Sequence, residues 1–138
     1  MYEKIVVPLD GSKLAEIALP YAESLAGNMK AEIILLTILE SAEAHEYQKH
    51  QIYIEKILEA TKHYAEKYLE KSGGKAIKIG AASRLGYPAE GIVSYANRGG
   101  FKLIIMATHG RSGLGRWAIG SVADKVVRIT TRPAAIAG

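Results

Sequence analysis

Four short apolar runs divide the chain, and between them apolar residues recur every three or four positions. Three runs, at residues 4–9, 32–39 and 101–106, are nearly continuous, whereas polarity alternates in the weaker run at residues 75–81. Nearly continuous runs of this length are typical of strands covered on both faces in a parallel sheet. We therefore expect three buried strands, and a further strand near an edge of the sheet at the weaker run.

The segments between the runs predict helices. A turn at residues 10–12 leads into a helix that runs to about residue 26 and bends at Pro20, which lacks the backbone N–H of other residues. A polar connector is expected over residues 40–51. The long helix that follows it is expected to end at Gly73 and Gly74.

Two more helices are expected in the second half of the chain. Pro88 opens a shorter one at its first turn, where a missing N–H is harmless, and Gly99 closes it. The last helix begins near Ser121, and Asp124 three residues later completes a capping box. Residues 134–137 follow as a short segment with side chains too small for their pattern to predict a strand.

Alternating strands and helices predict an α/β fold with a doubly wound open parallel sheet, helices on both faces, and residues 1–138 as a single domain. Ligands of such sheets bind outside the carboxyl ends of the strands, where the strand order reverses. Three loops meet at that edge, at residues 8–12, 37–41 and 107–121. They bring together an acidic residue, an apolar patch and a basic loop rich in glycine.

The glycine-rich loop lies within MATHGRSGLGRWAIGS, residues 106–121, between the expected fourth strand and the last helix. The first N–H groups of a helix have no internal partners and attract anions, and glycines let the backbone approach a phosphate closely. Arg111 and Arg116 add positive charge, with no acidic residue between them. The pattern favours an anion site, although glycines that only permit turns would give the same spacing. The candidate glycines are Gly110, Gly113, Gly115 and Gly120.

Other kinds of site are excluded or disfavoured. The chain has no cysteine, which excludes disulfides, thiol nucleophiles and cysteine metal sites. No Gly-Lys-Ser/Thr follows the glycine-rich loop, so the lysine that supports phosphoryl transfer in a P-loop is missing. The first strand ends PLDGS, unlike the G-x-G-x-x-G of a dinucleotide site. Binding is therefore favoured over turnover, and any hydrolysis is expected to be slow.

Charge and hydropathy restrict the partners. The net charge is +4, but lysines and glutamates are interleaved in the long helix, as on a solvated helix face. The tyrosines form no stacking platform for bases, and we do not expect nucleic acid as a partner. No segment approaches the roughly 18 apolar residues of a membrane span, so a cytoplasmic protein is expected.

Two segments together resemble the ATP-binding branch of the universal stress protein family. They are IVVPLDGS at residues 5–12 and IIMATHGRSGLGRWAIGSVADKV at residues 104–126, and the resemblance covers essentially the whole chain. It implies a five-stranded sheet in the order 3-2-1-4-5, an adenine nucleotide as ligand (ATP with Mg²⁺ or Mn²⁺), and a homodimer. Because residues 134–137 offer little side chain to bury, pairing of the dimer through the last strand is not expected.

The resemblance also assigns roles to residues. Pro8 and Leu9 would line the base, Ile38 would pack on adenine, and Met106 would close the base pocket. Asp10 would meet the ribose or a metal ion. The family's Gly-x2-Gly-x9-Gly-Ser loop would hold the phosphates, and its positions here are Ala107, Gly110, Gly120 and Ser121, with Arg111 and Gly113 inside the loop and Val122 after it. Ala107 departs from the motif, because it stands at the position of the first glycine.

The expected function is that of a nucleotide-dependent sensor or regulatory module. One alternative is an interaction module on the same fold that does not bind nucleotide, which the departure at Ala107 leaves open. A weaker alternative is a slow ATP phosphohydrolase. Asp10 also has a simpler role available, since an aspartate at this position caps a following helix. Capping and ligand binding can coexist.

Overall fold

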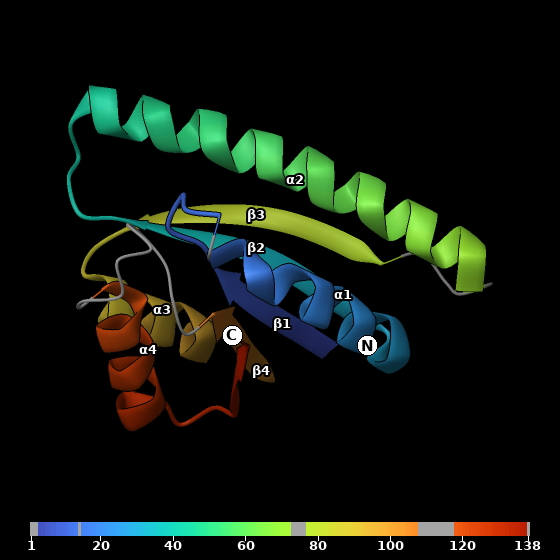
Figure 1. Ribbon diagram of the computed structural model, residues 1–138. Helices are drawn as coiled ribbons and strands as arrows, with labels where there is room; N and C mark the ends of the chain where they lie inside the picture. The colour runs from blue at the N-terminus through green and yellow to red at the C-terminus, as the bar shows by residue number, and fades with distance from the viewer. Residues whose placement is uncertain (1–2, 14, 73–76, 108–117, 138) are drawn as a thin grey trace.

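Five parallel strands form one sheet in the order β3-β2-β1-β4-β5, which confirms the expected order. The computed structural model describes residues 3–13, 15–72, 77–107 and 118–137 (Figure 1). The strands are β1 (Glu3–Pro8), β2 (Ala31–Leu39), β3 (Lys78–Leu85), β4 (Leu103–Ala107) and β5 (Ala134–Ala137). The chain runs outward from β1 to β3 and then returns to the other side at β4, so the strand order reverses between β1 and β4.

Helices cover both faces of the sheet. They are the 3-10 helix η1 (Ala15–Ile17) and the α-helices α1 (Ala18–Met29), α2 (Ala44–Ser72), α3 (Pro88–Arg98) and α4 (Ala118–Ile129). A hydrogen bond from Tyr53 to Glu16 joins α2 to η1, and an ion pair between Lys125 and Glu90 joins α4 to α3. Figure 1 shows α2 on one side of the sheet and α3 and α4 on the other. Among the described residues, no helix combines the length and the apolar content needed to cross a membrane.

The core lies in the three central strands. Ile5, Val6 and Val7 of β1 are fully buried, as are Ile33 of β2 and Ile104 of β4. Strands this apolar on both faces must be covered by helices on both faces, which is the reason for the doubly wound architecture. The core therefore holds the carboxyl ends of β1, β2 and β4 in fixed positions.

The expected bend at Pro20 is wrong, because the α-helix begins later than the sequence pattern indicated. Residues 15–17 form a 3-10 turn, α1 starts at Ala18, and Pro20 is the third residue of α1. An N–H at that position has no acceptor within the helix, so proline removes nothing there. The helix also passes residue 26 and ends at Met29, with Lys30 in the left-handed conformation as its C-cap.

Two other boundaries also differ from the predictions. The expected connector over residues 40–51 is wrong, since α2 begins at Ala44. Its first turns are exposed or half-buried, so they carry no apolar pattern. The weaker strand, described from Lys78 onward, continues to Leu85, past its expected end at residue 81, because β3 pairs with β2 from Glu32 up to Leu39. Its expected position at an edge of the sheet is confirmed.

The last helix starts one turn earlier than expected. Because α4 begins at Ala118, Ser121 is its fourth residue, and the predicted capping box between Ser121 and Asp124 is wrong. The carboxylate of Asp124 is instead paired with Arg128 one turn later. Residues 134–137 do form a strand, β5, which pairs with β4. The shorter helix α3 starts at Pro88, as the sequence predicted.

Candidate functional site

The strand register brings the predicted base-binding residues to one edge of the sheet. Val6 of β1 is level with Ile104 of β4, so Pro8 and Met106 each lie two residues further toward the carboxyl edge. Pro8 also pairs with Leu36 of β2, which puts Ile38 two residues beyond that pair. These positions flank the reversal of strand order between β1 and β4, where ligands of doubly wound sheets bind.

The predicted apolar residues differ in how much of each reaches the surface. Pro8 is buried, Leu9, Met106 and Ala107 expose 4% or less of their surface, and Ile38 is half-buried. The backbone N–H of Leu9 donates to the Leu36 carbonyl oxygen at 2.8 Å, which extends the pairing of the two strands past the end of β1. Ile38 is therefore the accessible member of the set, and the other four are packed inside the protein at the same edge of the sheet.

The loop after β1 fixes the carboxylate of Asp10. Oδ1 of Asp10 accepts hydrogen bonds from the backbone N–H of Ser12 at 2.9 Å and from its hydroxyl at 2.6 Å. The Ser12 hydroxyl oxygen in turn accepts from the N–H of Ala15 at 3.2 Å, at the start of η1. Gly11 between them has φ +89°, which side chains disfavour. Asp10 thus stabilises the turn after β1, and the hydrogen bond to the N–H at the start of η1 comes from Ser12.

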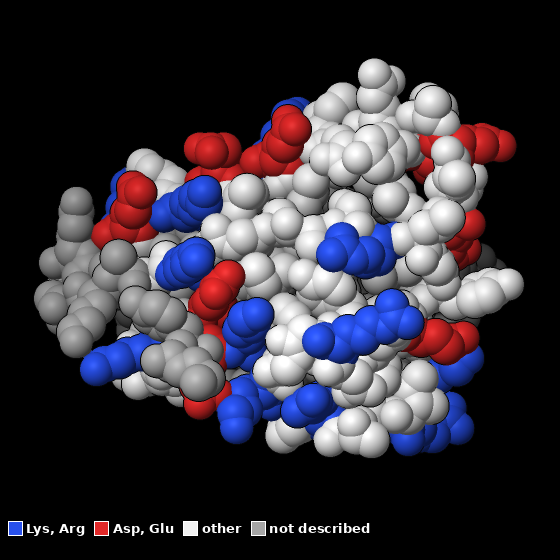
Figure 2. Space-filling model, turned by 180° about the vertical axis from the view of Figure 1, so that it is seen from behind, with Lys and Arg blue, Asp and Glu red and all other residues white. Residues whose placement is uncertain are grey.

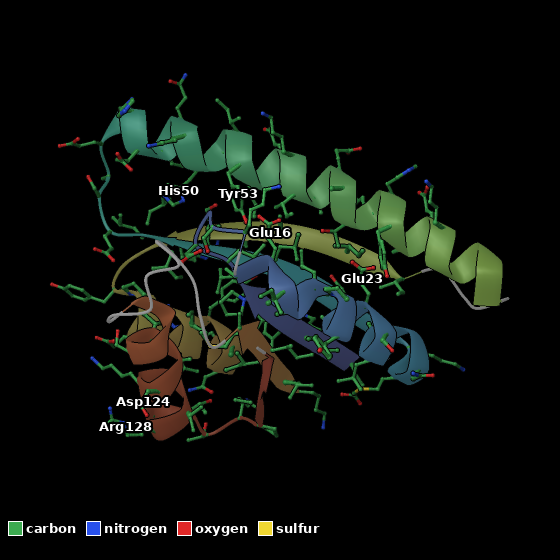
Figure 3. All side chains as sticks on the ribbon, viewed as in Figure 1. Glu16, Glu23, His50, Tyr53, Asp124 and Arg128 are labelled. Carbon is green, nitrogen blue, oxygen red and sulfur yellow. The ribbon has the colours of Figure 1, made fainter. Side chains whose placement is uncertain are left out.

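A second acidic residue lies beside this turn and was not predicted from sequence. The hydroxyl of Tyr53 donates to Oε2 of Glu16 at 3.0 Å (Figure 3). Burial, the charge of Glu16 and the charge of Asp10 all raise the pKa of Tyr53, so its hydroxyl stays protonated and remains a donor. The first part of α2 is therefore tied to the segment that follows Asp10. A polar pair separated by 37 residues leaves no signal in a single sequence.

The start of α4 is the described part of the predicted phosphate loop. Gly120 and Ser121 lie in the first turn, followed by Val122, which is half-buried. In any α-helix the N–H groups of the first three residues have no partners inside the helix and carry partial positive charge, and Gly120 is one of these three residues in α4, whereas the N–H groups of Ser121 and Val122 are placed to donate within the helix. The remaining predicted loop residues, Gly110, Arg111, Gly113, Gly115 and Arg116, lie outside the described residues.

The described residues, 3–13, 15–72, 77–107 and 118–137, contain no site for a metal ion that is bound by protein ligands alone. No group of three or more His, Cys, Asp or Glu side chains comes together there. Mg²⁺ bound to a nucleotide needs less, because one or two carboxylates together with phosphate oxygens and water satisfy it. Asp10 at the carboxyl end of β1 suits that second arrangement.

Charged side chains do not form a continuous track on the face shown in Figure 2. Lys and Arg are separated there by uncharged surface and, toward the sides, by Asp and Glu. Lys125 is paired with Glu90 at 3.1 Å, and Arg128 with Asp124. A polyanion that contacts successive phosphates requires a stripe of positive charge, and this face does not provide one.

Comparison with known proteins places the chain in a family. The model of the universal stress protein family matches residues 1–137. Universal stress protein YxiE of Bacillus subtilis is 31% identical over an alignment 146 positions long, which covers 99% of both chains. Universal stress protein MJ0577 of Methanocaldococcus jannaschii is 27% identical over an alignment 150 positions long, which covers 96% of this chain and 93% of the relative.

Solved structures show the same fold. The structure of MJ0577 matches with a TM-score of 0.68 and 30% identity, covering 99% of this chain and 95% of that one. A universal stress protein in complex with cAMP matches with a TM-score of 0.70 and 24% identity, covering 99% of this chain and 96% of that one. A universal stress protein from Archaeoglobus fulgidus in complex with dAMP matches with a TM-score of 0.72 and 18% identity, covering 98% of this chain and 97% of that one. This chain therefore belongs to the universal stress protein family.

Proposed function

We propose that the chain binds one adenine nucleotide, ATP carrying a divalent cation, at the carboxyl edge of β1 and β4. The observation that carries the proposal is the register, which sets Pro8 level with Met106 at the reversal of strand order and puts Asp10 just beyond. The start of α4 follows β4 in the chain, as a phosphate site requires. Two proteins of the same fold were solved with cAMP and dAMP, which supports an adenine nucleotide here.

The base would lie against Ile38, the half-buried member of the predicted set. Pro8, Leu9 and Met106 would form the apolar floor beneath it. A base that is apolar on its faces and polar at its edges suits such a floor, with backbone groups at the strand ends supplying the hydrogen bonds. The proposal thus uses all four predicted residues, with Ile38 making the main side-chain contact.

The phosphates would lie at the first turn of α4. Gly120 would let them approach the backbone and would contribute its N–H group, with the Ser121 hydroxyl as a further donor and Val122 next to it in the helix. Gly110, Arg111 and Gly113 would complete the loop from the other side. Ala107 places a methyl group at the motif's first glycine, and its complete burial means that this methyl packs within the protein.

Asp10 would hold Mg²⁺ or Mn²⁺ together with the phosphate oxygens. Its carboxylate already accepts two hydrogen bonds from Ser12, so it is held in place before any ligand arrives. The cation would supply charge neutralisation at the phosphates. Asp10 would orient the cation relative to the ribose.

The nucleotide would serve as a signal. The glycine-rich loop lacks the lysine of a P-loop, so slow hydrolysis at most is proposed, and the bound state would be read through the loop or through assembly. A homodimer in the cytoplasm is part of this proposal. A surface other than β5 would form the dimer, because residues 134–137 are three alanines and one isoleucine.

Ala107 favours a second candidate function, an interaction module of the same fold that does not bind nucleotide. The two are separated by mass spectrometry of small molecules released when freshly purified protein is denatured. An adenine nucleotide at near one per chain is expected. Phosphate release followed over hours, with and without Mg²⁺, distinguishes passive binding from slow hydrolysis.

Replacement of Gly120 by valine tests the phosphate contact. The variant Gly120→Val should lose ATP binding, because two methyl groups would block the approach of the phosphates. Gly27→Val in α1 is the matched control, since a Cβ at Gly27 meets only one side-chain atom within 4 Å, at 3.9 Å. Unchanged ATP affinity in Gly120→Val would contradict the proposed phosphate site.

A further inference from the structure

One helical glycine makes unusually close contact with the proposed base-binding residue. Gly91 lies in the first turn of α3, and a Cβ built on it would lie 3.0 Å from Cδ1, 3.2 Å from Cγ2 and 3.3 Å from Cγ1 of Ile38. All three distances are shorter than ordinary van der Waals contact. The side chain of Ile38 therefore occupies the space that a side chain at position 91 would need.

Backbone conformation gives no reason for a glycine at this position. Positive φ is recorded for Gly11, Gly86 and Gly100, and Gly91 is not among them. Its N–H makes a helical hydrogen bond to the Tyr87 carbonyl at 2.7 Å. A glycine within a helix costs about 1 kcal/mol relative to alanine. The space taken by Ile38 is the remaining explanation.

We propose that Gly91 is a positioning residue for the base, because its missing side chain fixes where the Ile38 side chain lies at the carboxyl edge of β2. The inference rests on the proposed function. Ile38 is half-buried and can give way, so a methyl group at position 91 would shift it by a few tenths of an ångström instead of preventing folding. A shift of the surface that meets adenine alters the fit of the base, and the contacts with phosphate would remain.

The same sheet face contains a matched control. A Cβ at Gly80 of β3 would lie 3.1 Å from Cδ1 of Ile34, which precedes Ile38 by four residues on β2. Strand residues four apart point to the same face, so both contacts involve the same face of β2, with Gly80 next to Ile34 within the sheet and Gly91 above Ile38 on a helix. Ile34 lies far back from the carboxyl edge, level with Val6 of β1. Gly80→Ala therefore perturbs comparable packing away from the base.

The test measures binding of ATP and of inorganic tripolyphosphate, each with Mg²⁺, by calorimetry. Gly91→Ala should weaken ATP binding about tenfold and should leave tripolyphosphate binding unchanged. Tenfold is the lower end of the effect that one added or missing methylene has in an apolar pocket. Gly80→Ala should change neither. In an Ile38→Val background, which removes the nearest atom Cδ1, the effect of Gly91→Ala on ATP should shrink by at least half.

The outcomes separate this inference from the function on which it rests. If the unmodified protein binds no ATP, the proposed function fails and the inference fails with it. If it binds ATP and Gly91→Ala binds equally well, the positioning role alone is overturned. Equal losses for ATP and tripolyphosphate, or an undiminished effect in the Ile38→Val background, would also overturn it, because each indicates a general disturbance of packing.

Discussion

The carboxyl group of Glu23 makes the stability of this protein depend on pH. Glu23 lies on α1, points toward α2 (Figure 3) and exposes only 3% of its surface. Its Oε2 is buried without a hydrogen-bond partner among the described residues. The charged side chains of α2 between Ile54 and Lys67 are all exposed, so none of them neutralises Glu23 inside the interface. Burial raises the pKa of Glu23 to about 7.

The size of the effect follows from linkage. An acid whose pKa is raised on folding favours the folded state while it is protonated, so its full contribution is present below the unfolded value of 4.5. As pH rises from there to about 7, stability falls by about 1.4 kcal/mol per pH unit. The total loss above pH 7 is about 3 kcal/mol, a large part of the stability of a small domain.

Replacing Glu23 with glutamine removes the charge and keeps the shape. The free energy of unfolding, measured by urea denaturation at pH 5, 6, 7 and 8, should be similar for Glu23→Gln and the unmodified protein at pH 5. At pH 8 the variant should be more stable by about 2 to 3 kcal/mol. Glu59→Gln, which changes an exposed residue of α2, is the control and should follow the unmodified protein throughout. The reasoning is refuted if Glu23→Gln and the unmodified protein keep the same difference at all four pH values.

Three further substitutions test the turn after β1 and its link to α2. Ser12→Ala removes one hydrogen-bond donor to Asp10 and the acceptor for the N–H of Ala15. It should lower the free energy of unfolding by about 1 kcal/mol and weaken Mg²⁺-ATP binding. Unchanged ATP affinity would show that this turn does not contribute to the nucleotide site. Tyr53→Phe should cost about 1 kcal/mol in urea denaturation through its lost bond to Glu16, and no loss would show that the pair is not formed in solution. Gly11→Ala, at φ +89°, should lower the melting temperature by several degrees, whereas an unchanged value would contradict the left-handed turn.

The sequence predicted best where burial imposes a strong pattern. The apolar runs of β1, β2 and β4 are buried on both faces, so almost every position carries the signal. Pro88 at the start of α3 is equally clear, because few other positions in a helix accept proline. These elements fix the strand order and bring Asp10 to the edge where the ligand is proposed.

The errors fall where exposure or pairing decides the structure. The first turns of α2 are exposed and therefore show no apolar spacing, and β3 owes its extent to its pairing with β2. The sequence predicts Pro20 inside a helix, because apolar residues have similar spacing in a 3-10 turn and in an α-helix. The pattern therefore does not show where the 3-10 turn ends and α1 begins. Glu16, Tyr53 and Gly91 act through contacts with residues distant in sequence, which a single sequence does not record.

Calorimetric titration of the freshly purified, ligand-free chain with ATP and Mg²⁺ tests the central claim most directly. We predict one binding site per chain with a dissociation constant well below about 1 mM, and loss of that binding in Gly120→Val with Gly27→Val unaffected. Absence of binding up to millimolar ATP, in protein whose fold is verified by circular dichroism, would contradict the assignment of this edge of the sheet as a nucleotide site.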